Sequence, residues 1–440
     1  MSPFEIGLIS VGVFVILMLL RLPIAIALAS VGVVGFGVIR GFPAALSLIA
    51  TDIYTTFSSY TLSVVPMFVL MGAFAYHSGL GEELYKAAHK ILGRIPGGLA
   101  ISSVWACAIF GAVCGSNPAT TATIGSIAIP EMKRYKYADT LSTGTVAAAG
   151  AIGAMIPPSV IFIIYASLTE QSVTKLFMAG IVPGLLLALV YSLTILFLVK
   201  KNPALAPMTL EKGDKEGKEG TGRKEKIGGG LLEVAIVFGV ALGGLFAGWF
   251  SPTEAGSIGA AGVLIIPIIR GNLGWDGIKK ALQDTTRTTA MILFLIAGAT
   301  IFSHLIAVSR IPFELATAVG NLPLPNFAIL LIIMVAYLVL GTFLDTIPII
   351  LLTIPIFYPV VVDKLGNDPI WFGVMILMVS AIGVVTPPVG INVYVAKGVA
   401  KEVPIETIFK GVMPFIITGS ILTVILIAFP QISTFLPYLL

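Results

Sequence analysis

The sequence predicts an all-α polytopic membrane protein made of two inverted repeats, each with a re-entrant helical hairpin and a discontinuous helix. The first observation is composition: 57% of the 440 residues are hydrophobic and 11% are charged, with a mean hydropathy of +1.03. Soluble proteins are about 25% charged, so lipid is the solvent for most of this chain. The second observation is a set of apolar stretches that reach the roughly 17 to 25 residues needed to span a bilayer. The third is a duplicated motif, AIGAMIPPSVIF at 151–162 and AIGVVTPPVGIN at 381–392.

The two halves of the chain follow one plan. With an offset of about 230 positions, Gly111 and Pro118 fall on Gly341 and Pro348, and seven of sixteen positions match around the double prolines. Such an offset, held along the chain, indicates an internal structural repeat. The sequence therefore predicts a first repeat over 1–199 and a second over 231–440. The segment between them, 200–230, is rich in Lys, Glu and Gly and is expected to be a mobile linker on the cytoplasmic side.

The predicted elements of the first repeat follow in order. A long crossing over roughly 43–76 precedes a hairpin over about 97–131, and a broken helix follows over about 140–168. In the second repeat the hairpin is expected over about 325–360 and the broken helix over about 370–400.

Two amphipathic stretches, Gly81–Arg94 and Pro312–Gly320, are too short and polar to span a bilayer. They are expected to lie along the membrane interface.

The distribution of basic residues predicts the orientation of the chain. With the N-terminus outside, Lys86, Lys90 and Arg94 reach the cytoplasm together with the basic linker, whereas Arg40 and Arg310 fall on the outer side. An odd number of crossings then separates the repeats and inverts one with respect to the other.

The double prolines predict helix breaks within the membrane. Each proline lacks an N–H donor and clashes with the preceding turn, so the helices are expected to unwind near Met155–Pro158 and Thr386–Pro388. Carbonyls freed in hydrocarbon are costly unless they are paired, buried in protein or line a watery cavity. An ordinary proline kink is the alternative for either break. Two breaks at equivalent points of inverted repeats are typical of the ion and substrate sites of transporters.

Each break has a predicted partner in a hairpin turn, CGSNPATTAT at 114–123 and GTFLDTIPIILLT at 341–353. Na⁺ is a hard ion that prefers oxygen ligands, which carbonyls and Ser, Thr or Asn side chains supply. The predicted first sodium site comprises Ser116, Asn117, Gly150, Gly153, Met155 and Pro157, and the second comprises Gly341, Thr342, Asp345, Thr346, Thr386, Pro387 and Gly390. In the alternative interpretation these hydroxyls only pack helices closely or bond to carbonyls of their own helices.

Two charged residues depart from the repeat pattern. Asp345 falls opposite Gly115, and an acid at a membrane-buried hairpin tip predicts a role at the second cation. Arg310 falls opposite Gly79 and is a candidate for pairing with an anionic substrate group, or for reaching lipid phosphate instead. The other predicted substrate contacts are Asn117, Thr353 and Asn392.

The sequence contains no motif for an enzyme. It has no glycine-rich phosphate loop with Lys, no motif surrounds any of the three histidines, and Asp345 is the only good deep acid. We therefore expect no catalytic residues, no cofactor other than Na⁺ as a coupling ion, and no nucleic-acid partner.

Four segments carry a family resemblance: FGAVCGSNPATTATIG, GAIGAMIPPSVIFIIY, KLFMAGIVPG and SAIGVVTPPVGINVYV. With them the chain resembles the large membrane subunit of the tripartite ATP-independent periplasmic (TRAP) transporters, within the wider ion-transporter superfamily. The resemblance implies a scaffold, an elevator-type transport domain and location in the bacterial inner membrane. It places hairpin tips at Gly115–Pro118 and Asp345–Pro348, with crossover loops at Gly153–Pro158 and Gly383–Pro388.

The resemblance also implies an activity, namely sodium-coupled uptake of a small organic acid, either a carboxylate or a sulfonate. Two partners are implied: a small four-helix membrane subunit, expected here as a separate chain, and a periplasmic substrate-binding protein. The alternative is a stand-alone sodium- or proton-coupled anion symporter that needs no binding protein.

Overall fold

The computed structural model describes residues 1–207 and 229–439, and within these ranges every regular element is a helix. The first half contains α1 (Pro3–Leu19), α2 (Ile24–Arg40), α3 (Phe42–Ser58), η1 (Thr61–Ser63), α4 (Val64–His77), α5 (Leu80–Leu92), α6 (Gly98–Cys114), α7 (Asn117–Arg134), α8 (Asp139–Ala149), η2 (Ile152–Ala154), α9 (Val160–Thr169), α10 (Val173–Lys201) and η3 (Pro203–Leu205). The second half contains α11 (Gly229–Phe246), α12 (Pro252–Arg270), α13 (Trp275–Val308), α14 (Ile311–Gly320), α15 (Asn326–Phe343), α16 (Thr346–Tyr358), the π-helix η4 (Pro359–Lys364), α17 (Pro369–Gly383), α18 (Ile391–Val399), α19 (Ile405–Ala428) and α20 (Gln431–Leu439).

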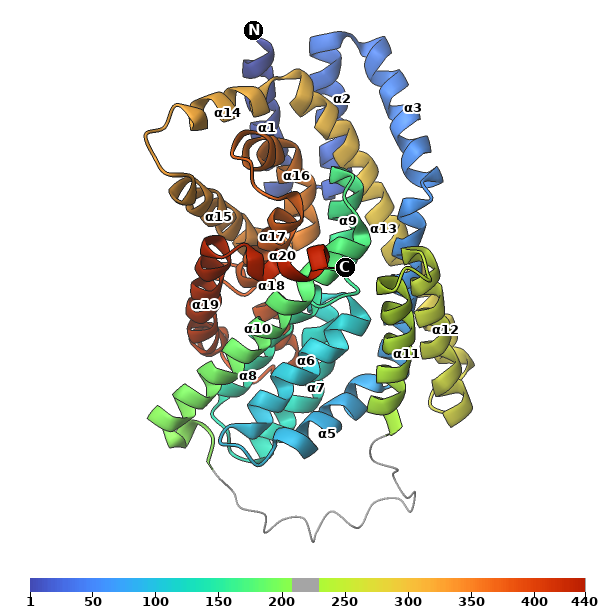
Figure 1. Ribbon diagram of the computed structural model, residues 1–440, viewed down its shortest axis with the longest axis vertical. Coiled ribbons are helices and arrows are strands. Elements are labelled where there is room, and N and C mark those ends of the chain that lie inside the picture. Colours follow the sequence, from blue (N-terminus) through green and yellow to red (C-terminus); the bar gives the residue numbers. More distant parts are fainter. Residues whose placement is uncertain (208–228, 440) are drawn as a thin grey trace.

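The order of these helices confirms the two predicted repeats. The elements α11 to α19 follow the same plan as α1 to α10, with the hairpin α15–α16 in the place of α6–α7 and the broken helix α17–α18 in the place of α8–α9. The repeats are inverted: the short arm α5 lies at the lower end of the molecule and its counterpart α14 at the upper end (Figure 1). They also exchange partners, since α2 packs along α13 and α12 packs along α4.

The first repeat contains a bend that its counterpart lacks. The long crossing predicted over 43–76 is bent, because α3 and the segment Thr61–His77 meet at an angle of 55°. The bend falls in a polar run, where the hydroxyl of Ser59 accepts a hydrogen bond from the N–H of Leu62 at 3.4 Å and the hydroxyl of Ser63 donates to the carbonyl of Tyr60 at 2.6 Å. Such local bonds compete with a continuous helix. The corresponding α13 runs unbroken for 34 residues.

The predicted linker over 200–230 overlaps the end of α10, which continues to Lys201, and the helix η3. Most of that linker prediction falls on 208–228, outside the described residues.

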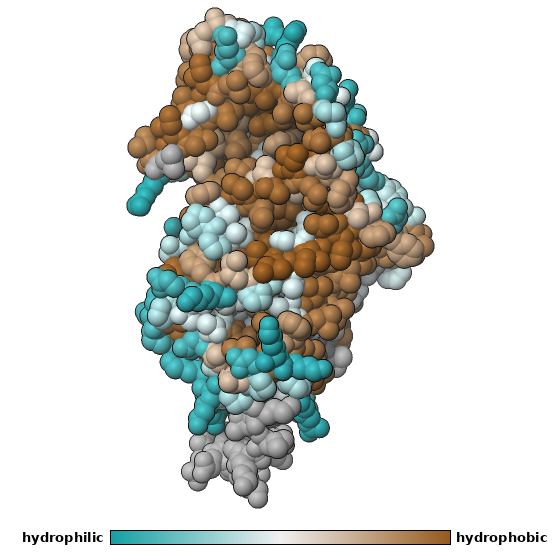
Figure 2. Space-filling view, turned by 90° about the vertical axis from the view of Figure 1, so that its left-hand side faces the viewer, coloured by the Kyte–Doolittle hydropathy of each residue, from teal (hydrophilic) through white to brown (hydrophobic). Residues whose placement is uncertain are grey.

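The outer surface of the bundle is apolar along several helices. On α15, Ile332, Val335 and Val339 are each more than half exposed, and they recur at helical spacing on one face. Figure 2 shows hydrophobic side chains over the upper and middle parts of one face, with hydrophilic side chains gathered at the lower end. In the described residues, six helices are long and apolar enough to cross a membrane, or seven if the bent pair counts as one span. The chain is a multi-pass membrane protein.

The two hairpins and the two broken helices form a bundle of their own. Every residue of α17 from Ile370 to Gly383 is buried, which is typical of a helix enclosed by protein on all sides. Around it, α15 packs on α17, α18 packs on α7 and α8, and α8 packs on α19. The helices α4 and α13 contact this bundle from outside, through α6 and α16 respectively.

Candidate functional site

The tip of the first hairpin is a tight turn between α6 and α7. Gly115 has a φ of +64°, a left-handed conformation that favours glycine, and its N–H donates to the carbonyl of Gly111 at 2.7 Å. Ser116 caps α7, since its hydroxyl accepts a hydrogen bond from the N–H of Ala119 at 3.4 Å. Asn117 opens α7, and its residue surface is only 3% exposed. The turn thus buries polar side chains at the end of two apolar helices.

The second hairpin reaches the same shape with a different cap. Asp345 is the N-cap of α16, and its Oδ1 accepts a hydrogen bond from the N–H of Thr346 at 2.7 Å. A carboxylate at a helix N-terminus is also favoured by the helix dipole. Asp345 therefore also caps α16 at the hairpin tip, a role that the sequence did not predict.

Each hairpin touches the helix break of its own repeat through a pair of glycines. A Cβ placed on Gly111 would overlap the Cα of Gly153, and the reverse also holds. In the second repeat, a Cβ on Gly341 would lie 2.8 Å from the Cα of Gly383, and one on Gly383 would lie 2.6 Å from the Cα of Gly341. Side chains are excluded at these crossings, so hairpin and break meet backbone to backbone.

The first break lies between α8 and α9. The helix α8 ends at Ala149, the short helix η2 follows, and α9 begins at Val160, directly after Ser159. Unwinding thus begins before the predicted Met155–Pro158. Gly150 lies against Thr121 of α7, where a Cβ would overlap the threonine hydroxyl. The peptide bond between the two prolines of this break is cis, as it is in the second break.

The second break lies between α17 and α18 and bonds to its hairpin. The N–H of Gly390 donates to the carbonyl of Thr342 at 3.3 Å, which joins the loop after the prolines to the end of α15. Gly390 has a φ of +62°, which only glycine adopts readily. The hydroxyl of Thr386 donates to the carbonyl of Ile382 at 2.7 Å. Of the residues predicted for the second site, Thr342 and Gly390 are therefore brought into contact.

The polar side-chain atoms of the hairpins and broken helices fall into two groups. Those of Thr342, Thr353 and Thr386 donate to carbonyls of their own helices, as the alternative interpretation expected. Such a bond uses the hydroxyl proton and leaves the lone pairs of the oxygen able to bind a cation. The second group has no hydrogen-bond partner in the described part of the chain, although each atom is buried: Asn117 Oδ1, Thr120 Oγ1, Ser159 Oγ, Thr346 Oγ1, Ser380 Oγ and Asn392 Oδ1.

Buried polar atoms without partners are rare, and each calls for an ion, a water or a ligand. The set consists of neutral hydroxyl and amide oxygens, which fits an alkali cation. Among residues 1–207 and 229–439, no group of three His, Cys, Asp or Glu side chains has a geometry for holding a metal. The donor chemistry thus fits Na⁺ better than a transition metal.

Sequence reasoning missed several of these residues. Thr120, Ser159 and Ser380 are fully buried, but none was among the predicted ligands. A signal existed for Ser159, which follows a double proline and occupies the N-cap position of α9. No such signal existed for Thr120 and Ser380, because their place in the packed bundle depends on how their helices are rotated.

The predicted substrate residues do not form one cluster. Asn117, Thr353 and Asn392 are buried to 3% exposure or less, whereas Arg310 is exposed at the start of α14. Arg310 lines a cavity of about 640 Å³ that none of the other three reaches. The remaining lining residues are Leu168, Ser303, Ala307, Pro312, Phe313, Ala316, Ile354, Pro355, Tyr358, Pro359, Asp363 and Lys364.

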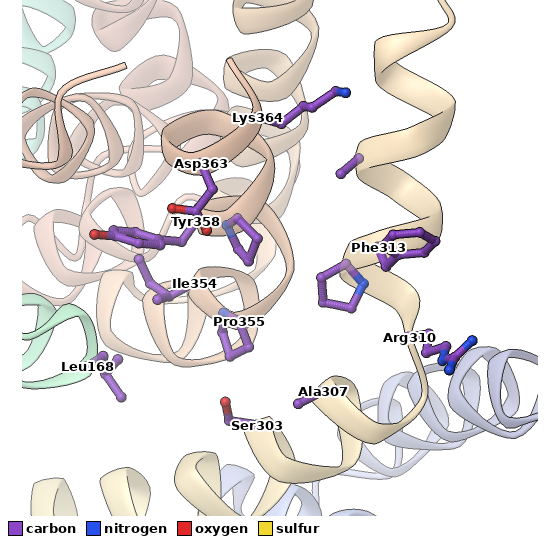
Figure 3. Close-up of a pocket in the computed structure, with 13 residues that line it drawn as sticks. Leu168, Ser303, Ala307, Arg310, Phe313, Ile354, Pro355, Tyr358, Asp363 and Lys364 are labelled. Atoms are coloured by element: carbon purple, nitrogen blue, oxygen red, sulfur yellow. The ribbon is translucent and has the colours of Figure 1, made fainter. Parts of the chain in front are cut away.

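This cavity separates α13 and α14 from the outer end of the second hairpin. Figure 3 shows Arg310 on the side of α13 and α14, across the cavity from Tyr358 of α16 and Asp363 of η4, with its side chain directed away from them. Arg310 has a φ of +62°, in the position where the first repeat has Gly79 with a φ of +77°. Arg310 thus stands at the rim of a cavity, away from the hairpin tips.

The chain matches a family model described as "Tripartite ATP-independent periplasmic transporter, DctM component" over residues 11–432. This chain belongs to the DctM family of TRAP transporter large permeases. The permease is 36% identical over 398 residues to the C4-dicarboxylate TRAP transporter large permease protein DctM of Pseudomonas aeruginosa, and the match covers 90% of each chain. These findings confirm the family resemblance and the expectation that the chain is a transporter and not an enzyme.

Two further comparisons bear on the permease. It is 34% identical to the isethionate TRAP transporter permease protein DctMQ of Oleidesulfovibrio alaskensis, over 97% of this chain and 64% of that longer protein. The crystal structure of the Alcanivorax borkumensis YdaH transporter superposes with a TM-score of 0.67 at 16% identity, covering 90% of each chain. That superposition supports the fold alone.

Proposed function

We propose that the permease carries out sodium-coupled uptake of a small organic acid that a periplasmic substrate-binding protein delivers. The family membership supports transport, and the two junctions between hairpin and break support the coupling ion. The hairpins and broken helices carry buried side-chain oxygens without a hydrogen-bond partner in the described residues. A bound cation would satisfy several of them together.

The substrate class follows from the relatives and from Arg310. One relative is named for C4-dicarboxylates and another for isethionate, so carboxylates and sulfonates are both within the proposed class. Arg310 offers a permanent positive charge with a planar set of donors that suits either group. We propose that it attracts the anion into the 640 Å³ cavity.

The proposed mechanism is an elevator in the bacterial inner membrane, with the N-terminus in the periplasm. The hairpins and broken helices would slide as one body against α4 and α13. The contact of α4 with the first hairpin is close, since a Cβ on Gly72 would lie 2.7 Å from the carbonyl oxygen of Cys114. The arm α5 would stay with the scaffold, because Glu83 pairs with Arg270 of α12 at 3.1 Å.

The proposed partners are the binding protein and a small four-helix membrane subunit on a separate chain. The relative named DctMQ extends well beyond the length that this chain covers, which is consistent with a fused second subunit there.

Uptake into proteoliposomes tests the proposal. Vesicles would contain the permease and its small subunit, with the cognate binding protein outside and an inward Na⁺ gradient. We expect uptake of a labelled C4-dicarboxylate or small sulfonate that stops when K⁺ replaces Na⁺ and when the binding protein is left out. Uptake without the binding protein would instead identify a stand-alone symporter. Uptake at the same rate in K⁺ as in Na⁺ would contradict sodium coupling.

A further inference from the structure

Asn392 is hydrogen-bonded to both helix breaks. Its main-chain N–H donates to the carbonyl of Val384, in the unwound segment after α17, at 3.1 Å. Its side-chain Nδ2 donates to the carbonyl of Ala147, in the last turn of α8, at 3.3 Å. The two acceptors belong to different repeats. Asn392 is fully buried, so both bonds are made away from solvent.

The carbonyl of Ala147 is one that the first break sets free. In a regular helix it would accept from the N–H of Ala151, but that N–H donates to the carbonyl of Ala148 at 3.2 Å. The N–H of Gly150 is likewise engaged, with the carbonyl of Val146 at 3.0 Å. The side chain of Asn392 therefore takes the place of the helical donor, and it does so from the other repeat.

The rest of the Asn392 side chain also faces the first junction. Its Oδ1 is buried and has no hydrogen-bond partner in the described ranges, 1–207 and 229–439. The helix that carries it, α18, packs on α7 and α8, the helices on either side of the first predicted cation site. The equivalent position in the first repeat is Phe162, which has no polar group to return the bond. The link is thus made by one repeat only.

We propose that Asn392 is a positioning residue that couples the two sodium sites. This inference rests on the proposed function, since it concerns the same two sites. A cation that orders the second break fixes the start of α18, and with it the donor that holds Ala147. The first break is then already ordered when its own cation binds. By linkage, binding at the first site favours the second by the same factor.

Sodium-dependent thermal stabilisation of the purified full-length permease tests this without a transport assay. A ligand that binds the folded state raises its stability with concentration, so the midpoint of unfolding can be followed over a range of Na⁺. Because this stabilisation keeps rising with the logarithm of the Na⁺ concentration, its slope against that logarithm gives the number of ions bound. For the natural protein we expect this number to rise with a Hill coefficient above 1, approaching about 2 as the upper limit for two sites. For Asn392→Ala we expect a Hill coefficient near 1, with Na⁺ stabilisation still present but reduced wherever Oδ1 is also a ligand. Asn392→Leu, which keeps the volume of the side chain, is the second variant.

Asn367 supplies a matched control. Its Nδ2 donates to the carbonyl of Val361 at 3.0 Å, from the loop between η4 and α17 and away from either break. Asn367→Ala removes a similar amide bond and should leave the Hill coefficient unchanged. An equally steep sodium response in the natural protein and in both Asn392 variants would overturn the coupling role, as would a natural protein that responds with a Hill coefficient of 1. If Na⁺ stabilises none of these proteins, the sodium sites of the proposed function are themselves wrong.

Discussion

Gly111 and Gly153 lie so close that a Cβ on either would overlap the Cα of the other. The pair joins the first hairpin to the first helix break, and Gly341 and Gly383 form the same contact in the second repeat. Backbone contact of this kind lets carbonyls from two elements approach one small ion. It also leaves no room for adaptation, since even a methyl group must displace one of the two chains.

Gly111→Ala and Gly383→Ala should therefore separate hairpin from break. We expect each to lower the free energy of unfolding by about 1–3 kcal/mol, the usual cost of overpacking, and to remove most sodium-driven uptake. Thermal unfolding in detergent and uptake into proteoliposomes measure the two effects. Gly12→Ala on α1 is the control, because nothing lies within 4 Å of its Cβ position. It should be neutral or stabilising by up to ~1 kcal/mol through helix propensity, and a similar result for Gly111→Ala would contradict the close contact.

The elements of the site could be predicted because their signals are local. Glycines and double prolines mark where a helix cannot continue, and the second copy of the motif distinguishes a broken helix from a kink. The turn at Gly115 and the cap at Asp345 were within reach for the same reason. What could not be read is which side chain meets which freed carbonyl. The bond from Asn392 to Ala147 joins positions 245 residues apart in different repeats, and only the packed bundle brings them together.

The bend between α3 and α4 was not predicted. The stretch 43–76 is apolar enough to be read as one span, and its counterpart α13 is indeed continuous. The hydroxyls of Ser59 and Ser63 bond locally at the bend, and sequence alone gives no weight to such bonds against a continuous helix.

Asp345→Asn separates the two tasks of Asp345. Asparagine caps a helix about as well as aspartate, so we expect α16 and the folded protein to remain intact. The negative charge at the second site is lost, so uptake should fall at least about tenfold, equivalent to ~1.4 kcal/mol of cation binding. Uptake measured against Na⁺ concentration checks this. Asp345→Ala removes the cap as well and should cost a further ~1 kcal/mol of stability. Asp345→Asn protein with the natural sodium dependence would leave Asp345 as a helix cap only.

Thr346→Val tests whether a buried unpaired hydroxyl is a cation ligand. Thr346 is 1% exposed, and within the described residues its Oγ1 has no partner. Valine keeps the shape without the oxygen. Without Na⁺, removing an unsatisfied polar atom should leave stability unchanged or raise it by about 1 kcal/mol. With Na⁺, the stabilisation should be smaller than in the natural protein. The two measurements thus move in opposite directions.

Thr423→Val is the matched control for that experiment. Thr423 is also buried, but its hydroxyl donates to the carbonyl of Gly419 at 3.0 Å on α19, outside the site. Na⁺ should stabilise this variant as much as it stabilises the natural protein. If Thr346→Val retains the full sodium response too, its hydroxyl makes no contact with the ion.

Arg310→Gln tests the role of the cavity between α14 and the second hairpin. Arg310 lines this cavity together with Lys364 and Asp363, and the hairpin tips lie elsewhere. Removing the charge should therefore raise the KM for the organic anion severalfold while the dependence on Na⁺ stays as it is. Arg310→Lys keeps the charge and should recover part of the affinity, since lysine lacks the planar pair of donors. Uptake against substrate concentration, at fixed saturating Na⁺, gives both values. A natural KM in Arg310→Gln would assign the side chain to lipid phosphate, and a changed sodium dependence would place Arg310 nearer the ion sites than the cavity indicates.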